Sequence, residues 1–382
     1  MAGERGGGVI KRILSDYLDD VIVSEILARI PVKCLMRFRS VCKSWRALIA
    51  DPHFVKKHLS YAEGGIIDNS SRLLFLMNPP QSIDYEALKD LKEDGDGYFA
   101  NRALEFPVKF PSLKFVSERI MVMGSCNGLI CVEVEGVGIV LWNPCTRDSK
   151  VLPNPPAANF HPLDFYGFCH DSTTDDYKII RGRRSCEEAL IHVFTLKTGS
   201  WRTTRDLNYD EFRGKGCTGQ GCLLNGALHW LVGTGLQPRI MSFGVAEEKF
   251  EDTVVPLPDH KCSFHGVLKY KNYLCVYELL IGTPDFLSVW LMKEYGAKES
   301  WTQVIKFPFD MSKEDLRPLC ILENGEILMH RLLLYDPDQE LDAESLLVLI
   351  NQKTSKTVFE VDFGFGAAIY RETLVSPVTA SI

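Results

Sequence analysis

Apolar residues near the start of the chain recur at helical spacing. They share one helical face and are Ile22, Val23, Ile26, Leu27 and Ile30. This pattern predicts a helix over residues 20–30 with a wide apolar face, beginning at Asp19 or Asp20. Pro31 marks its end, because a proline disfavours the helical conformation of the residue before it.

A second helical segment is predicted after this break. Its apolar positions step by three and four residues, at Leu35, Phe38, Val41, Cys42, Trp45 and Leu48. Pro52 ends the run. Two or three short helices in about forty residues bury too little apolar surface to be stable alone. The segment is therefore expected either to pack on the rest of the chain as a plain helical subdomain or to bind a partner.

From Arg72 onward the pattern changes to short apolar runs rich in Val, Ile, Phe, Tyr and Trp, separated by Gly, Pro, Asn and Asp turns. This pattern predicts a body that is mostly β-sheet. Residues 78–101 contain Pro79-Pro80 and Asp94-Gly95-Asp96-Gly97 without a strand pattern, and they are predicted to form a loop or insertion.

The β body repeats itself with a turn followed by an apolar strand. The turns begin at Asn127, Asp175, Asn225, Lys271 and Asn324, and each is followed by a second apolar strand and another turn. A period near fifty residues with several strands per unit is typical of propeller blades of the kelch size class. The alternative is an irregular array of β-sandwich hairpins.

Five such units are visible, and residues 72–116 together with strands at 357–363 and 367–374 would supply a sixth. The aromatic residues that end the units, such as Trp201 and Trp301, are expected to pack between neighbouring blades. The repeat has the length of a kelch repeat, but the Gly-Gly doublet that is typical of kelch repeats is missing. The units are therefore not assigned as strict kelch repeats.

Composition narrows the function classes. The 382 residues are 46% hydrophobic and 24% charged, which is typical of a globular chain. Residues 1–60 carry 11 Lys and Arg against 6 Asp and Glu, whereas the whole chain has a net charge of −7. The remaining body is therefore strongly acidic, which argues against general affinity for nucleic acid.

Targeting and metal signals are not found. Residues 1–11 are small and Gly-rich, without the apolar region of a secretory signal, and are expected to be flexible. No apolar run reaches the roughly eighteen residues of a membrane span. The 12 Cys include no Cys-x-x-Cys pair and no His partner at zinc-ligand spacing. We therefore expect a cytoplasmic or nuclear protein with core thiols and neither metal nor cofactor.

At the N-terminal helices a family resemblance becomes specific. Leu18 to Ile30, Pro31-Val32-Lys33-Cys34-Leu35, Val41-Cys42-Lys43-Ser44-Trp45 and Asp51-Pro52 resemble the F-box of plant F-box proteins. The resemblance implies that residues 12–58 bind a Skp-type adaptor and, through it, a cullin scaffold. It also implies that some residues of the motif contact the adaptor and that the others form the motif's own core. The residues that divide between these two roles are Leu18, Ile22, Pro31, Val32, Leu35, Val41, Cys42 and Trp45.

One position departs from the family pattern. The family usually has Leu-Pro at the start, and this chain has Leu18-Asp19. Because Asp can cap a helix as Pro can begin one, adaptor binding is expected to survive, and the sequence leaves open whether Asp19 weakens it.

The β body also resembles part of this family. Ser125 to Ile130, Leu141 to Arg147 and Tyr166 to Lys178 are similar to the F-box-associated, kelch-related domain of plant F-box proteins. The resemblance implies an α+β multidomain chain, with a small all-α F-box followed at residues 66–378 by an all-β propeller of about six blades. It further implies a non-catalytic substrate receptor of a ubiquitin ligase that holds an unknown target protein.

Two other function classes stay open. The first is a DNA-binding regulator, since helix, break and helix with five basic residues permit a helix-turn-helix, although apolar residues interrupt the basic ones. The second is a hydrolase built on the propeller. Gly124-Ser125-Cys126-Asn127-Gly128 matches a nucleophile elbow, but strand residues follow it where an elbow needs a helix. Gly214 to Gly219 matches a dinucleotide fingerprint without the strand and helix that it requires.

Propellers bind through loops at one face or at the central opening, and the loops most open to elaboration are predicted at residues 78–101, 154–165 and 202–221. One group of residues is a specific candidate for target binding. Arg181, Arg183 and Arg184 could bind an acidic or phosphorylated segment by bidentate pairing. The simpler interpretation is a solvated basic run on an acidic protein.

Overall fold

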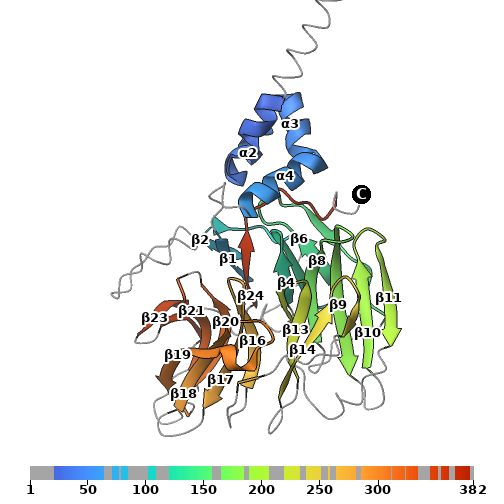
Figure 1. Ribbon diagram of the computed structural model, residues 1–382. Helices are drawn as coiled ribbons and strands as arrows, with labels where there is room; N and C mark the ends of the chain where they lie inside the picture. Colours follow the sequence, from blue (N-terminus) through green and yellow to red (C-terminus); the bar gives the residue numbers. More distant parts are fainter. Residues whose placement is uncertain are drawn as a thin grey trace, which may run out of the picture.

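The computed structural model places a helical unit on one face of a six-bladed β-propeller (Figure 1). It describes residues 21–63, 71–76, 79–84, 102–108, 120–156, 165–184, 189–205, 219–232, 238–250, 257–258, 264–280, 285–310, 312–322, 324–333, 345–351, 354–360 and 366–378. The expected architecture of a small α-helical motif before an all-β propeller is confirmed.

The helical unit contains more breaks than the sequence predicted. Residues 21–27 are helical, followed by α2 (Val32–Phe38), α3 (Lys43–Ala50) and α4 (Pro52–Glu63). The single second segment over residues 35–48 was wrong, because Cys42 has an extended backbone and begins α3 as its N-cap. Its sulfur accepts a hydrogen bond from the backbone N–H of Trp45 at 3.4 Å.

Pro52 both stops α3 and starts α4. Asp51 precedes it, and the Asp51 carboxylate accepts hydrogen bonds from the N–H groups of His53 at 2.9 Å and Phe54 at 3.1 Å. These bonds satisfy two of the N–H groups that a helix start leaves without partners, and proline suits the first helical position. The helical unit therefore continues to Glu63, beyond the expected boundary at residue 58.

Each blade of the propeller is a four-stranded antiparallel sheet. Blade 1 contains β24 (Gly366–Arg371), β1 (Ser71–Leu76), β2 (Gln81–Asp84) and β3 (Arg102–Ala103). Blade 2 contains β4 (Ile120–Cys126), β5 (Leu129–Val134), β6 (Gly138–Trp142) and β7 (Ser149–Val151). Blade 3 contains β8 (Phe165–Asp171), β9 (Asp176–Arg184), β10 (Ala189–Thr195) and β11 (Ser200–Arg205).

The remaining three blades follow in chain order. Blade 4 contains β12 (Cys222–Leu224), β13 (Ala227–Val232), β14 (Arg239–Gly244) and β15 (Lys249–Phe250). Blade 5 contains β16 (Phe264–Tyr270), β17 (Tyr273–Leu280), β18 (Asp285–Met292) and β19 (Trp301–Phe309), with a short 3-10 helix at Lys298–Ser300. Blade 6 contains β20 (Glu314–Ile321), β21 (Ile327–Leu333), β22 (Ser345–Ile350) and β23 (Ser355–Glu360). The first strand of every blade contacts the first strands of its two neighbours, so these six strands surround the axis.

The ring closes through strands from opposite ends of the chain. β24 pairs antiparallel with β1, with Leu73 opposite Ile369, and it supplies the first strand of blade 1. The predicted sixth blade is thus present, although the strand expected at 357–363 belongs to blade 6 as β23. The predicted loop at 78–101 differs in one respect, because β2 lies within it and residues 85–101 are outside the described part.

The sequence repeat arises from the first hairpin turn of the blades. In blade 2 the turn residues Asn127 and Gly128 have φ of 51° and 79°, and in blade 4 Asn225 and Gly226 have 50° and 77°. Two consecutive positive φ values define a hairpin turn that Asn-Gly adopts readily and that fits the twist of the strands. The recurring Asn-Gly pairs are therefore structural.

Six hydrophobic clusters lie between neighbouring blades. Trp201 packs in the cluster between blades 2 and 3, and its indole N–H donates to the carbonyl of Pro153 at 2.7 Å. Trp301 is buried in the cluster between blades 4 and 5. Both aromatic residues therefore pack between blades, as the sequence predicted.

Candidate functional site

The helical unit has one hydrophobic core of its own. Its buried members are Leu27, Ala28, Val32, Leu35, Ile49 and Phe54, together with Leu374 from the C-terminal segment. Two residues expected to divide between docking and core, Val32 and Leu35, are 1% and 0% exposed. In this structure both serve the core.

Other residues of the expected docking set face solvent. Ile22 and Val41 are 54% and 62% exposed, and Pro31 and Cys42 are also exposed. Trp45 is half-buried with its ring edge-on to Phe38 at 5.6 Å between centroids. Leu18 lies outside the described residues.

Sequence reasoning did not include two further exposed apolar side chains of the first helix, residues 21–27, in the docking set. Val21 is 43% exposed and Ile26 is 56% exposed. Ile22 and Ile26 lie one helical turn apart and therefore share a face. The apolar stripe of residues 20–30 already contained Ile26, but a stripe alone does not tell which of its members turn inward.

The first helix is fastened to α4 by polar contacts around Glu25. Its carboxylate pairs with Lys57 and accepts a hydrogen bond from the Tyr61 hydroxyl at 2.9 Å. These hydrogen bonds lower the pKa of Glu25 below its usual value. The His58 ring, on α4, is buried and bonds to the Ile30 carbonyl at 2.9 Å, and burial lowers the pKa of His58, so the ring is neutral near pH 7.

The helical unit is seated on the propeller through α4. Val55 and Leu59 pack against the hydrophobic cluster between blades 2 and 3. Lys56 makes an ion pair with Asp175 in the first turn of blade 3. Figure 1 shows α4 directly over this face, with the C-terminal segment running beside it.

The C-terminal segment fixes this seat from the other side. Leu374 enters the helical core, while the next residue, Val375, enters the cluster between blades 2 and 3. The buried Asn143 amide donates to the carbonyls of Thr373 at 3.1 Å and Val375 at 2.6 Å. Helical unit and propeller therefore share core residues, which fixes their relative orientation.

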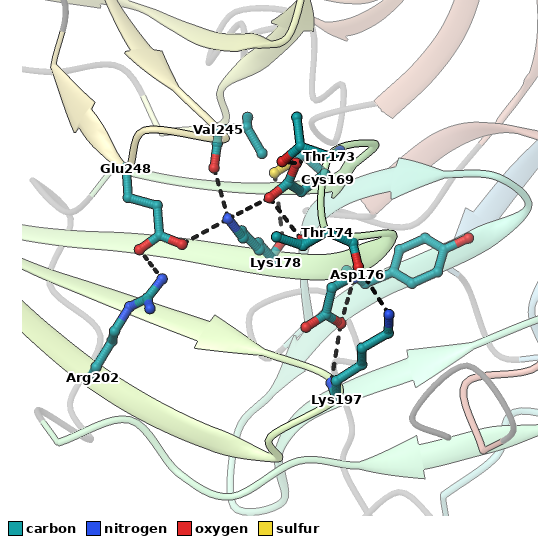
Figure 2. A network of polar contacts seen from close by, with 11 residues as sticks. Cys169, Thr173, Thr174, Asp176, Lys178, Lys197, Arg202, Val245 and Glu248 are labelled. Atoms are coloured by element: carbon teal, nitrogen blue, oxygen red, sulfur yellow. Dashed lines mark hydrogen bonds and ion pairs between the residues drawn. The ribbon is translucent and has the colours of Figure 1, made fainter.

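A buried polar network joins blades 3 and 4 (Figure 2). The Lys178 ammonium contacts the carboxylates of Asp171 and Glu248, each at 2.7 Å, and donates to the Val245 carbonyl at 2.8 Å. Arg202 also pairs with Glu248. Since an ammonium has three N–H donors, all three of Lys178 are used by protein groups, and the network is structural.

The arginine candidates for target binding lie on β9 and not in a loop. Arg181 is 2% exposed, and its guanidinium bonds to the Glu133 carboxylate of blade 2 at 3.0 Å. Strand residues alternate between faces, so Arg181 points toward blade 2 while Lys178 points toward blade 4. The side chains of Arg183 and Arg184 lie outside the described part, and target binding through them stays a prediction.

The catalytic alternatives find no support in the described geometry. Residues 124–128 form the end of β4 and a hairpin turn, and the Ser125 hydroxyl donates to the Ile369 carbonyl. Burial raises the pKa of the Cys126 thiol to about 12, which keeps it protonated. Within the described residues no cluster of three or more His, Cys, Asp or Glu could hold a metal, and no helix could cross a membrane. Most of the glycine-rich segment 214–219 is outside them.

A cavity of about 890 Å³ lies on the propeller axis, lined by residues of all six blades. Its wall is formed mainly by the first strands, from Gly124 on β4 to Ala367 on β24.

Comparisons with known proteins agree with this two-part architecture. Residues 16–57 match the model of the F-box domain, and residues 99–366 match the model of the F-box associated beta propeller domain. Three similar proteins come from Arabidopsis thaliana. F-box/kelch-repeat protein At3g23880 is 24% identical over 93% of this chain and 94% of its own length. F-box protein At3g07870 is 25% identical over 87% of this chain and 86% of its own length. The chain spans 62% of Putative F-box protein At3g16210, at 26% identity over 64% of this chain.

Proposed function

This chain belongs to the family of F-box proteins that carry an F-box associated beta propeller domain, and on this premise we propose that it is the substrate receptor of a Skp-cullin-F-box ubiquitin ligase. The helical unit binds a Skp-type adaptor, which joins it to a cullin scaffold. The propeller binds the target protein. The chain itself is not an enzyme in this role, because ubiquitin transfer is carried out by other components.

The exposed apolar side chains of the helical unit carry this proposal. Four of the eight large exposed apolar side chains in the described residues are Val21, Ile22, Ile26 and Val41. Such exposed apolar side chains, gathered on a small unit whose core is filled by other residues, are typical of a protein-binding surface. A DNA-reading helix would present basic and polar side chains instead.

The shared core between helical unit and propeller suits a receptor. Leu374 and Val375 link the two parts, and Lys56 and Asp175 pair across them. A target held on the propeller would therefore keep a constant position relative to the adaptor. A loose tether would lose part of this advantage, since flexible linkage lowers the effective concentration of target at the enzyme.

The target is expected on the face away from the helices. The first hairpin turns, at Asn127 and Asp175, lie on the helical side, since Asp175 pairs with Lys56 of α4. The strand ends Val151 and Arg205, which lead into the long connections to the next blade, therefore lie on the other side. Long connections on a rigid scaffold are the usual carriers of recognition.

We also propose a cytoplasmic or nuclear location, where such ligases assemble. The nine cysteines within the described ranges are free thiols, which agrees with a reducing compartment.

Binding of a purified Skp-type adaptor to the full-length protein tests the proposal. The variant Ile22→Asp with Ile26→Asp places two charges on the exposed face of the first helix. Burial of each isoleucine side chain contributes about 1.5 to 3 kcal/mol, so affinity should fall by at least about 100-fold. Leu35→Asp is less suitable, because Leu35 is fully buried and the unit would unfold.

The matched control is Val151→Asp, which changes a side chain that is 50% exposed on blade 2. It should bind the adaptor as the unchanged chain does. Absence of adaptor binding by the folded, unchanged protein would overturn the proposal. Equal binding by the Ile22/Ile26 variant would show that this face is not the docking surface.

A further inference from the structure

The axial cavity carries positive charge on an otherwise acidic protein. Lys269 on β16, Lys271 in the following turn and Arg371 at the end of β24 line it. Both lysines are exposed, and the arginine is half-buried. The whole chain has a net charge of −7, so a cationic interior is not a consequence of composition.

The charge of Lys269 reaches across the axis. Burial raises the pKa of Cys126, on the opposite blade 2, to about 12, and the charge of Lys269 acts in the other direction. The same holds for Cys222 on the neighbouring blade 4. Lys269 is therefore close enough to thiols on two other blades for its charge to act on them, and it is one of the residues that line the cavity.

The three cations have no acidic partner within the described part of the chain. None of them makes an ion pair there, and the Lys271 ammonium lies 5.2 Å from the centroid of the Tyr270 ring. The described cavity wall contains no Asp or Glu. The charge of Glu63, at the end of α4, acts to raise the pKa of Cys126, but Glu63 is not part of the cavity wall and one carboxylate does not balance three cations.

The rest of the wall is largely apolar side chains and glycine, with some neutral side chains that can donate hydrogen bonds. They include Gln220, Asn272 and Tyr277. Burial raises the pKa of Tyr277 and Cys320 to about 12, so neither adds negative charge at neutral pH. Cations surrounded by neutral donors in a confined space suit an anionic ligand.

We propose that the axial cavity binds a small molecule with several phosphate groups, held by Lys269, Lys271 and Arg371. Its volume of about 890 Å³ lies within the range of small-molecule sites, about 300 to 1,000 Å³. The arginine offers a fork for bidentate contact, and the lysines act as mobile point charges. Lys271 and Arg371 lie at the helical end of the cavity, in the turn after β16 and at the end of β24.

Titration calorimetry of the full-length protein with tripolyphosphate tests this inference at low and at physiological salt. We expect one site per chain. The variant Lys269→Glu with Lys271→Glu should bind at least about tenfold more weakly, since it replaces two charged hydrogen-bond donors by carboxylates that repel an anion. The control Lys293→Glu reverses an exposed charge outside the cavity wall and should change affinity by less than about twofold at physiological salt.

Arg371→Gln gives a second variant in case a double charge reversal disturbs the propeller, and thermal unfolding establishes that each variant is folded. No tripolyphosphate binding by the unchanged protein would overturn the inference, as would an equal loss in Lys293→Glu. Preference for an acidic phosphopeptide over tripolyphosphate would also overturn it in favour of a peptide site. Adaptor binding should be unchanged in all these variants, because the cavity does not include the docking helix.

Discussion

The helical unit has one hydrophobic cluster, centred on Leu27, Val32 and Leu35, whereas the propeller has one between each pair of neighbouring blades. The helical cluster takes Leu374 from the C-terminal segment, and the first helix still leaves Val21, Ile22 and Ile26 exposed. The propeller instead closes its ring with β24 and buries charged side chains between blades.

This difference indicates how the two regions depend on their surroundings. A unit of about forty residues cannot form a large core, so the helices rely on their contacts with the propeller. The propeller has enough core, and its buried ion pairs of Lys178 with Glu248 and of Arg181 with Glu133 join neighbouring blades. The helical unit should therefore respond to changes in shared apolar contacts, and the propeller to changes in buried charge.

The largest effect is expected from Lys178→Ala in the propeller. The change leaves the 2% exposed Asp171 carboxylate without its cation, and breaking a buried pair costs about 3 to 5 kcal/mol. Arg202 still pairs with Glu248, so the lower end of this range is expected. Urea unfolding followed by tryptophan fluorescence measures the loss.

The control for this variant is Lys197→Ala, because Lys197 is exposed and bonds to the Thr174 carbonyl beside the network (Figure 2). Its stability should change by less than about 1 kcal/mol. Equal losses in the two variants would contradict the view that the buried charge sets blade packing.

A smaller and more local effect is expected from Leu374→Ala. Removing a buried leucine side chain costs about 2 to 5 kcal/mol, and the lower end applies at the edge of a small core that can relax. Amide hydrogen exchange should quicken in α2 and α3, while blade 5 keeps its protection. If amide exchange quickened equally in the helices and in blade 5, the helical unit and the propeller would unfold as one unit. The proposed difference in how the two regions are stabilised would then be wrong.

The sequence was informative where local chemistry decides the structure. Asn127-Gly128 and Asn225-Gly226 predicted hairpin turns because few other pairs adopt two positive φ values. The helical stripe ending before Pro31 was also a local signal. The break at Cys42 was missed, since its apolar neighbours continue the helical spacing while the backbone there is extended.

Long-range pairing could not be inferred from one sequence. The Lys178 ammonium bonds to the Val245 carbonyl, 67 residues away, and Arg181 pairs with Glu133, 48 residues away. Arg181 therefore turned inward although arginines are usually exposed. The cationic cavity was missed for the same reason, because Lys269 and Arg371 approach one axis from different blades.

The smallest effect concerns acid. Burial acts to raise the pKa of Asp171, but hydrogen bonds from Lys178, Thr173 and Thr174 outweigh it and hold this pKa well below its usual range. A carboxylate with a lowered folded-state pKa stabilises the protein above its unfolded pKa of about 3.9, and this contribution is lost as the pH falls below that value. The free energy of unfolding should thus decline below about pH 4, by at most about 1.4 kcal/mol per pH unit from this group, and the urea midpoint should fall with it. Asp171→Asn should flatten this decline. Glu25→Gln removes a carboxylate of lowered pKa from the helical unit, so it should leave the urea midpoint of the propeller unchanged. If the stability of Asp171→Asn and of the unchanged chain declined identically with falling pH, the groups whose protonation destabilises the propeller would be other than Asp171.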